Sequence, residues 1–456
     1  MTLAQMIVML FSVAMSLFVP KILGITAFSF WQLFIFYASY TGCLHLGLND
    51  GIYLKMGGKV LSADQKKSIS SQLWLSMLIQ LFVVILIFMC LYFTTENQSR
   101  IDVYAYVALY ALVNNIFNYC GSTLQSTNKI KGYAVCLMID KIVAIAIIVA
   151  LVVCKVQDFR WYVVAYLFGR LLATILLLVK FRDIFLNSFS IGQNVIRAIV
   201  SNIKVGYNLM IANIIGSFIL GVGRFVIDIN YPIEVFGIIS FSFTLTGFIL
   251  ALISQVGNSV FPVLATKDME FHKTVFPNLE RLMECLLPLS FLAYPFIWLL
   301  IQYYLPQYSD SLIYFVLLLP LCVFETKSSV LYYTYMKVLR KEKALLRINI
   351  LSLIISGGLV LISCYVFKEI QLIVSSLVVA EILKALLLAN CIKRTFNIDA
   401  PYLSMDVLLS VLCVLVLACI HSAMISIGIS SIIVIAYTLI RKKSIKESFT
   451  KVFVHQ

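Results

Sequence analysis

The feature that most constrains the fold is a series of apolar runs, each about 20 residues long and bounded by charged or turn-forming residues. About 20 residues of helix cross the hydrocarbon core of a bilayer, and a helix satisfies its own backbone hydrogen bonds there. Such runs predict about fourteen transmembrane helices, at residues 4–23, 26–47, 71–93, 102–124, 133–154, 160–180, 206–229, 233–263, 281–304, 311–335, 346–367, 371–391, 403–420 and 422–440. We therefore expect an all-α, polytopic membrane protein.

Composition agrees with this expectation. Hydrophobic residues make up 62% of the 456 and charged residues 12%, about half of the charged fraction of a soluble protein. The net charge of +14 does not indicate a nucleic-acid partner, because the cations lie in short groups between apolar runs rather than on one soluble face. The first cation, Lys21, follows the first run, which predicts a spanning helix rather than a cleaved signal peptide.

The distribution of Lys and Arg predicts the orientation, since cytoplasmic loops collect cations. With the N-terminus inside, 25 of the 35 cations fall on the cytoplasmic side, five fall outside, and five lie within spans. Both termini are then cytoplasmic.

The longest inner connection, 181–205, mixes basic residues with Ile, Phe and Val, which is typical of an amphipathic helix on the membrane surface. It divides the chain into an N-terminal six-helix lobe, 1–180, and a C-terminal six-helix lobe, 206–391. Residues 392–456 add two transmembrane helices and a basic cytoplasmic tail. Two lobes of this kind are a usual frame for alternating access.

No motif indicates catalysis. The chain has no Walker A sequence, its four histidines are far apart, and its eleven cysteines show no metal-binding spacing. No outer loop is long enough for a catalytic domain. We expect no catalytic residue, no metal and no cofactor, and a protein that is not an enzyme.

Charges inside the spans are the informative feature, because each costs about 2.5–3.5 kcal/mol at the bilayer centre. Arg170 is the deepest, at about 15 Å from either end of its span, and no acid lies within one turn of it. It is therefore the best candidate for binding an anion, although pairing with Asp140 of the neighbouring span remains an alternative. The five cations are Lys141, Arg170, Arg224, Lys327 and Lys384.

The spacing of these charges along the chain predicts which of them can pair on one helix. Glu381 and Lys384, at i and i+3, can pair on one helix face. The neighbours Asp140 and Lys141, and the near neighbours Glu325 and Lys327, point apart and need partners on other helices. Arg224 and Asp228 can pair at i and i+4 near the outer end. The candidates for substrate binding are Arg170, Lys141, Arg224 and Lys327, and those for proton or ion coupling are Asp140, Asp228 and Glu325.

Uncharged polar residues also recur within spans. Asn114 and Asn118 lie one turn apart, followed on the same face by Ser122 and Gln125. Gln255 and Asn258 close the 233–263 run. Such amides either line a cavity or hold helices together, and the sequence leaves both readings open.

The layout resembles the polysaccharide and O-antigen flippases of the multidrug/oligosaccharidyl-lipid/polysaccharide exporter superfamily. The best local matches are "PKILGITAFSFWQLFIFY", "LGLNDGIYLK" and "GRFVIDINYPIEVFGIISFSFTLTGF". Many members carry an Asp-Arg pair and later a Gly before a Tyr. Arg224 and Gly237 fit that pattern, whereas Gly223 replaces the acid and Ile238 the aromatic residue.

The resemblance implies two lobes around a central cavity that moves an undecaprenyl-pyrophosphate-linked oligosaccharide across the bacterial cytoplasmic membrane. Cavity cations would bind the pyrophosphate while the lipid tail stays among the membrane lipids. The final two helices match members with fourteen spans, in which they border a lipid groove. Partners implied are the polysaccharide polymerase and chain-length machinery.

Two alternatives remain. An ion-coupled multidrug or cation exporter of the same fold should favour acids and aromatic residues in its site. A membrane-embedded glycan polymerase or transferase should need a substantial outer loop.

Overall fold

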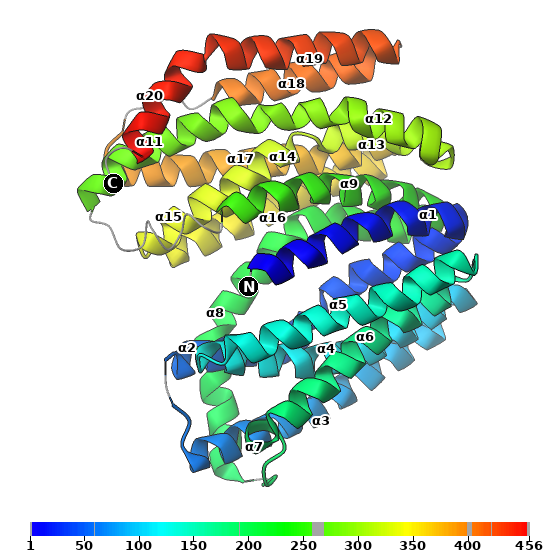
Figure 1. Cartoon of the computed structure of the whole chain (residues 1–456), viewed down its shortest axis with the longest axis vertical. Helices are drawn as coiled ribbons and strands as arrows, with labels where there is room; N and C mark the ends of the chain where they lie inside the picture. Colours follow the sequence, from blue (N-terminus) through cyan, green and yellow to red (C-terminus); the bar gives the residue numbers. More distant parts are fainter. Residues whose placement is uncertain are drawn as a thin grey trace. The chain divides into compact units, whose positions relative to one another are not determined.

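The computed structural model describes residues 2–58, 60–190, 192–257, 269–398, 404–420 and 422–453 (Figure 1). These residues are almost entirely helical, and none of them forms a β-strand. The expected fold class is confirmed: the chain is an all-α, polytopic membrane protein.

Ten helical segments in the described residues are individually long and apolar enough to cross a membrane, and a pair bent by 42°, Ser311–Leu318 with Leu321–Val338, makes an eleventh. The other three expected spans are also helical. The first lies before Gly24, whose positive φ of 71° breaks the helix Thr2–Ser39. Gln98–Ser126 is long but rich in polar residues, and Met405–Cys419 has only 15 residues.

The chain divides into two compact units, Met1–Ile214 and Ile215–Gln456, which we describe separately. The residues expected to form a surface linker, 181–205, make a short helix, Arg182–Phe185, and the first turns of α8 (Gln193–Asn230). This long helix continues without a break into residues 206–230, where the seventh span was expected.

Unit 1 consists of helices joined by short connections. Its elements are α1 (Thr2–Ser39), η1 (Thr41–His45), α2 (Leu48–Met56), α3 (Ala63–Thr94), α4 (Gln98–Ser126), α5 (Ile130–Val153), α6 (Phe159–Lys180), α7 (Arg182–Phe185) and the first half of α8. A capping box between Ser62 and Gln65 starts α3. The α7 turn is tied to α3, because Ser70 and Trp74 both donate hydrogen bonds to the carbonyl of Phe185, at 2.9 and 3.0 Å.

Unit 2 contains the rest of α8 and a set of shorter, broken helices. They are α9 (Ile233–Gly257), α11 (Met269–Leu286), η2 (Leu287–Leu292), α12 (Ala293–Tyr304), η3 (Pro306–Tyr308), α13 (Ser311–Leu318), α14 (Leu321–Thr326), η4 (Lys327–Tyr332), α15 (Tyr333–Val338), α16 (Glu342–Ile362), η5 (Ser363–Phe367), α17 (Ile370–Phe396), α18 (Met405–Cys419), α19 (Ala423–Ile440) and α20 (Lys442–Phe453). Helices α16 and α17 form an antiparallel pair, α18 packs on α13, and the basic helix α20 packs on α11.

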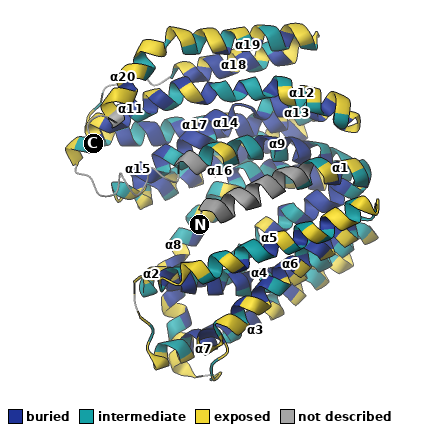
Figure 2. Ribbon diagram, in the orientation of Figure 1, coloured by how far each residue is buried: buried dark blue, intermediate teal, exposed yellow. Residues whose placement is uncertain are grey.

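Exposed residues line the outside of several helices (Figure 2), and many of them are large apolar residues, as expected where the surrounding solvent is lipid. On α3, Leu78, Phe82 and Leu86 are exposed, and on α19 Ile432 and Leu439 are exposed. The interior, by contrast, contains buried polar groups that bond to one another, as in Asn202 donating to Gln72 at 2.7 Å. An apolar outer surface and polar groups that are bonded where they are buried suit a helical protein in a bilayer.

Within unit 1, α2 crosses the start of α8, and the backbones of the two helices approach each other closely. A Cβ atom on Gly51 would overlap the backbone of Asn202, and one on Gly206 would overlap the backbone of Gly47. Gly47 also has a φ of 89°, which favours glycine. Small residues permit this crossing, which fixes the start of α8 against α2.

We expect Gly51→Ala and Gly206→Ala each to destabilise unit 1 by about 1–3 kcal/mol, the usual effect of overpacking. The measurement is the midpoint of thermal unfolding of the purified protein in detergent. Gly357→Ala is the control, since a Cβ on this helical glycine of α16 meets nothing within 4 Å. Equal midpoints for all three variants would contradict the tight crossing.

Candidate functional site

Helices α5 and α6 of unit 1 bring two cations to one carboxylate. The Nη2 atom of Arg170 lies 3.2 Å from Oδ2 of Asp140, and the Nζ atom of Lys141 lies 3.6 Å from the same oxygen. Lys141 also donates a hydrogen bond to the hydroxyl of Tyr166 at 3.0 Å. We call Asp140, Lys141, Tyr166 and Arg170 the cationic cluster. The pairing of Arg170 with Asp140, one of the two alternatives from the sequence, is the one observed.

A glycine beside Arg170 makes this meeting possible. A Cβ atom on Gly169 would lie 2.5 Å from the carbonyl oxygen of Asp140 and 3.0 Å from the Cβ of Ala144. The backbones of α5 and α6 therefore approach closely, as small residues allow in membrane helices. Asp140 and Arg170 consequently lie within the same layer of the bundle.

Burial differs among the charges of the cationic cluster. Asp140 is 1% exposed and Arg170 is 7% exposed, whereas the side chain of Lys141 retains 17% of its accessible surface. Two cations share a single carboxylate, so the cluster carries one excess positive charge. Lys141 is the most exposed of the three charged side chains.

Aromatic rings support both cations. The Nζ atom of Lys141 lies 4.4 Å from the ring centroid of Tyr166, and the Cζ atom of Arg170 lies 4.5 Å from that of Phe117. Tyr166 also packs against Trp31 and Tyr110. Cation–π contacts of this kind hold a cation in place without neutralising it. Sequence reasoning missed these rings, although Tyr166 precedes Arg170 by one helical turn and so shares its face.

Arg224, on α8 in unit 2, has a different environment. Its Nη2 atom donates to Oγ of Ser240 on α9 at 2.9 Å, and its guanidinium lies 5.3 Å from the ring of Phe236 and 5.6 Å from that of Phe243. Asp228 is buried one turn further along α8. The pairing of Arg224 with Asp228 stays a prediction.

Lys327 lies in the interior of unit 2 rather than beside open space. It is 2% exposed, and its Nζ atom lies 2.6 Å from Oδ2 of Asp406 and 3.6 Å from Oε1 of Glu284. Asp406 lies in the first turn of α18, outside the lobe 206–391 in which the sequence placed Lys327. A role of Lys327 in substrate binding stays a prediction.

Lys384 pairs with Glu381 at 2.7 Å, through the i, i+3 spacing expected from the sequence. A second carboxylate, that of Glu325, lies 3.0 Å away. Glu381 and Lys384 are almost fully buried, whereas the side chain of Glu325 keeps 27% of its accessible surface. Two carboxyl groups thus share one ammonium group, and we call Glu325, Glu381 and Lys384 the acidic cluster.

The amides of α4 hold helices together. Asn114 donates to the hydroxyl of Thr41 at 3.2 Å, and Asn115 donates to the carbonyl of Thr41 at 3.1 Å and to Oε1 of Gln80 at 2.7 Å. Asn118, which the sequence grouped with Asn114, is half-buried. Sequence reasoning missed Asn115 because it followed the helical spacing of Asn114 and Asn118, and Asn115 does not share that face.

Two further candidates cannot be placed in this way. The side chain of Gln255 and the whole of Asn258 lie outside the described residues.

Solved structures of membrane transporters resemble this chain over most of its length. The lipid II flippase MurJ, in an inward closed conformation, aligns with a TM-score of 0.72 at 13% identity and covers 99% of both chains. An inward-facing multidrug resistance MATE family transporter of the MOP superfamily aligns with a TM-score of 0.65 at 12% identity, over 87% of this chain and 98% of that chain. A MOP superfamily transporter from Pyrococcus furiosus Vc1 aligns at 0.52 and 12% identity, over 87% and 94%.

At these identities the similarity shows the fold, which is that of the MOP superfamily transporters. No protein family model and no curated protein sequence matches the chain.

We expect Asp140→Asn to destabilise the protein by about 3–5 kcal/mol, because it leaves two buried cations without their carboxylate. The measurement is the thermal unfolding midpoint in detergent. Asp102→Asn is the matched control: Asp102 pairs with Arg160 at 2.7 Å, but both side chains are partly exposed, so its loss should have a much smaller effect. A larger loss for Asp102→Asn than for Asp140→Asn would contradict the role of the cationic cluster.

Proposed function

We propose that this protein moves an undecaprenyl-pyrophosphate-linked oligosaccharide across the bacterial cytoplasmic membrane by alternating access. The oligosaccharide would be a repeat unit of an O-antigen, capsule or exopolysaccharide. The observation that carries the proposal is the cationic cluster, in which Lys141 and Arg170 outnumber Asp140 inside a membrane bundle. Its support is the fold, which this chain shares with a lipid II flippase.

The geometry of the cluster suits a pyrophosphate. Arg170 is fixed between Asp140 and the ring of Phe117, so its charge is oriented before any ligand arrives. Lys141 is less buried and makes one hydrogen bond, to Tyr166, which a phosphate oxygen can replace. Charge-assisted hydrogen bonds to phosphate are among the strongest available to a protein. The polyprenyl tail would remain in the bilayer throughout.

The same cluster argues against the export of a lipophilic cation. Such a ligand needs a carboxylate with no cation of its own, and Asp140 already has two. The aromatic rings around the site already contact cations of the protein, because Tyr166 faces Lys141 and Phe117 faces Arg170. An anionic substrate is therefore the better match for unit 1.

We further propose Glu325 as the coupling group. With Glu381 paired to Lys384, Glu325 is the carboxylate in excess, and it is the more exposed of the two. A cation bound there would balance the second carboxylate, because both carboxyl groups share the single ammonium group of Lys384. Asp140, the second candidate from the sequence, is less suited because two cations already contact its carboxylate. Asp228 remains a third candidate.

Lys141→Gln should weaken substrate binding about tenfold or more, since a hydrogen bond to a charged group contributes about 1.5–3 kcal/mol. The Arg170–Asp140 pair is left intact, so the variant should fold. The measurement is transport of a lipid-linked oligosaccharide from the outer to the inner leaflet of proteoliposomes. Transport is detected because the oligosaccharide that has moved inside is no longer cleaved by a glycosidase added outside.

Lys141→Arg, which keeps the charge, should retain most of this transport. Lys180→Gln is a control for a cation at the end of α6, where it lies outside the cluster. Wild-type transport by Lys141→Gln would reject the site, and preferential transport of a hydrophobic cation by the wild type would favour the multidrug exporter. Synthesis or extension of glycan chains by the purified protein would favour the polymerase or transferase.

Glu325→Gln should abolish the acceleration of transport by a transmembrane proton gradient, because the amide cannot release a proton. Transport of the lipid-linked oligosaccharide in the absence of a proton gradient should persist. The measurement compares transport in proteoliposomes with and without an imposed pH difference, and again with a sodium gradient. Glu369→Gln, an exposed carboxylate just before α17, is the control. A variant that still responds fully to both gradients would rule out Glu325.

A further inference from the structure

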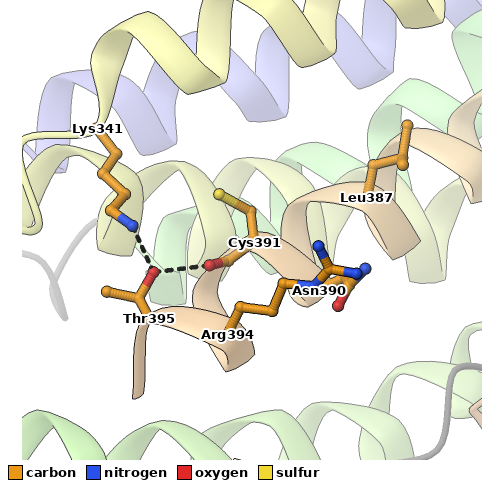
Figure 3. A pocket seen from close by; sticks show the side chains of 6 residues that line it. All are labelled: Lys341, Leu387, Asn390, Cys391, Arg394 and Thr395. Carbon is orange, nitrogen blue, oxygen red and sulfur yellow. Dashed lines mark hydrogen bonds between the residues drawn. The ribbon is translucent and has the colours of Figure 1, made fainter. Parts of the chain in front are cut away.

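Unit 2 contains a pocket of about 360 Å³ at the C-terminal end of α17 (Figure 3). Five of its lining residues come from α17 and the sixth, Lys341, immediately precedes α16. The lining residues are Lys341, Leu387, Asn390, Cys391, Arg394 and Thr395. Two of them are cations and none is an acid, so the pocket carries two positive charges.

The cations of the pocket are held by polar, uncharged groups. Lys341 donates to the hydroxyl of Thr395 at 2.6 Å, and Thr395 donates to the carbonyl of Cys391 at 2.7 Å. Figure 3 shows Arg394 and Asn390 on the same helix as Thr395 and Cys391. Within the described residues Arg394 has no carboxylate partner. Its neighbour Lys393 differs, since it pairs with Glu280 at 2.9 Å.

An apolar stripe leads away from the pocket along the same face of α17. Leu383 and Val379, one and two turns before Leu387, are exposed. Leu372 continues this exposed stripe towards the start of the helix. On this face of α17 the cation Arg394 lies in the last turn, and exposed apolar side chains occupy the turns before the pocket; Glu381 and Lys384 of the same helix are buried. An amphiphile with an anionic head and a hydrocarbon tail matches this order.

We propose that the pocket binds the phosphate group of an anionic membrane lipid in the cytoplasmic leaflet. The cation asymmetry of the loops predicts that this end of α17 is cytoplasmic. Basic pockets between helices on that side are suited to anionic head groups. The site lies in unit 2 and shares no residue with the cationic cluster, so it stands apart from the proposed substrate site.

The chemistry fits a phosphate ester attached to an apolar chain. Lys341 and Arg394 supply charge, Asn390 and Thr395 supply neutral polar groups, and Leu387 contacts the start of the tail. Either a phospholipid such as phosphatidylglycerol or a polyprenyl phosphate offers this combination. Inorganic phosphate offers only the head group, and the experiment separates these sources.

Cys391 provides a reporter, because its thiol lines the pocket and is partly exposed. The full-length protein is placed in nanodiscs of phosphatidylcholine, with or without phosphatidylglycerol, and maleimide labelling of Cys391 is measured on its peptide by mass spectrometry. We expect phosphatidylglycerol to slow the labelling of Cys391. Cys154, exposed and in unit 1, should label at the same rate in both and serves as the internal reference.

Lys341→Gln and Arg394→Gln should each raise the phosphatidylglycerol fraction needed for half-protection about fivefold, the equivalent of about 1 kcal/mol for one cation near an anionic lipid. Both residues are at least partly exposed, so the variants should fold. Lys343→Gln is the matched control, since Lys343 is exposed in the first turn of α16, two residues from Lys341, but does not line the pocket.

A third set of nanodiscs, of phosphatidylcholine with undecaprenyl phosphate, tests the other lipid source, and protection there alone would identify the carrier lipid as the ligand. The proposal is overturned by equal labelling of Cys391 in every lipid mixture. It is also overturned if Lys343→Gln loses protection as much as Arg394→Gln, which would indicate general attraction to the surface. Full protection by inorganic phosphate in phosphatidylcholine nanodiscs would indicate a site for a soluble anion instead.

Discussion

The structure depends on the free energy of placing charge in a medium that solvates it poorly. Each deep cation has a carboxylate within 4 Å: Arg170 has Asp140, Lys327 has Asp406, and Lys384 has Glu381. In both clusters the numbers of cations and carboxylates differ, and the excess is of opposite kind in the two units. The cationic cluster has one cation too many, and the acidic cluster has one carboxylate too many. A protein that binds an anion and couples its movement to a cation needs both kinds of imbalance.

The fold could be predicted from the sequence because its determinants are local. An apolar run of about 20 residues indicates a spanning helix whatever surrounds it, and in the described part of the chain each of the fourteen expected spans coincides with helical residues. The Glu381–Lys384 pair could also be predicted from the sequence, since the i, i+3 spacing on one helix fixes its geometry. The break at Gly24 and the bend in Ser311–Val338 could not be predicted, because a kink depends on backbone angles rather than on hydropathy.

Partners on different helices could not be predicted. Lys327 and Asp406 are 79 residues apart, and no local pattern favours Asp406 over the other acids as the partner of Lys327. The same holds for Asn115, whose bonds to Thr41 and Gln80 need the packing of three elements. The rings of Tyr166 and Phe117 were hidden for another reason: aromatic residues are common in membrane helices, and only their position over a cation distinguishes these two.

The order in which the chain is synthesised gives the ion pair of Lys327 a further consequence. The helix that carries Lys327 leaves the ribosome before α18, so its ammonium enters the membrane while Asp406 does not yet exist. Glu284, which is made earlier and ends 3.6 Å from Lys327, can serve as the interim counter-ion. The final helix pair then completes a contact that was already half-formed. Assembly of unit 2 is therefore finished only when its last helices are inserted.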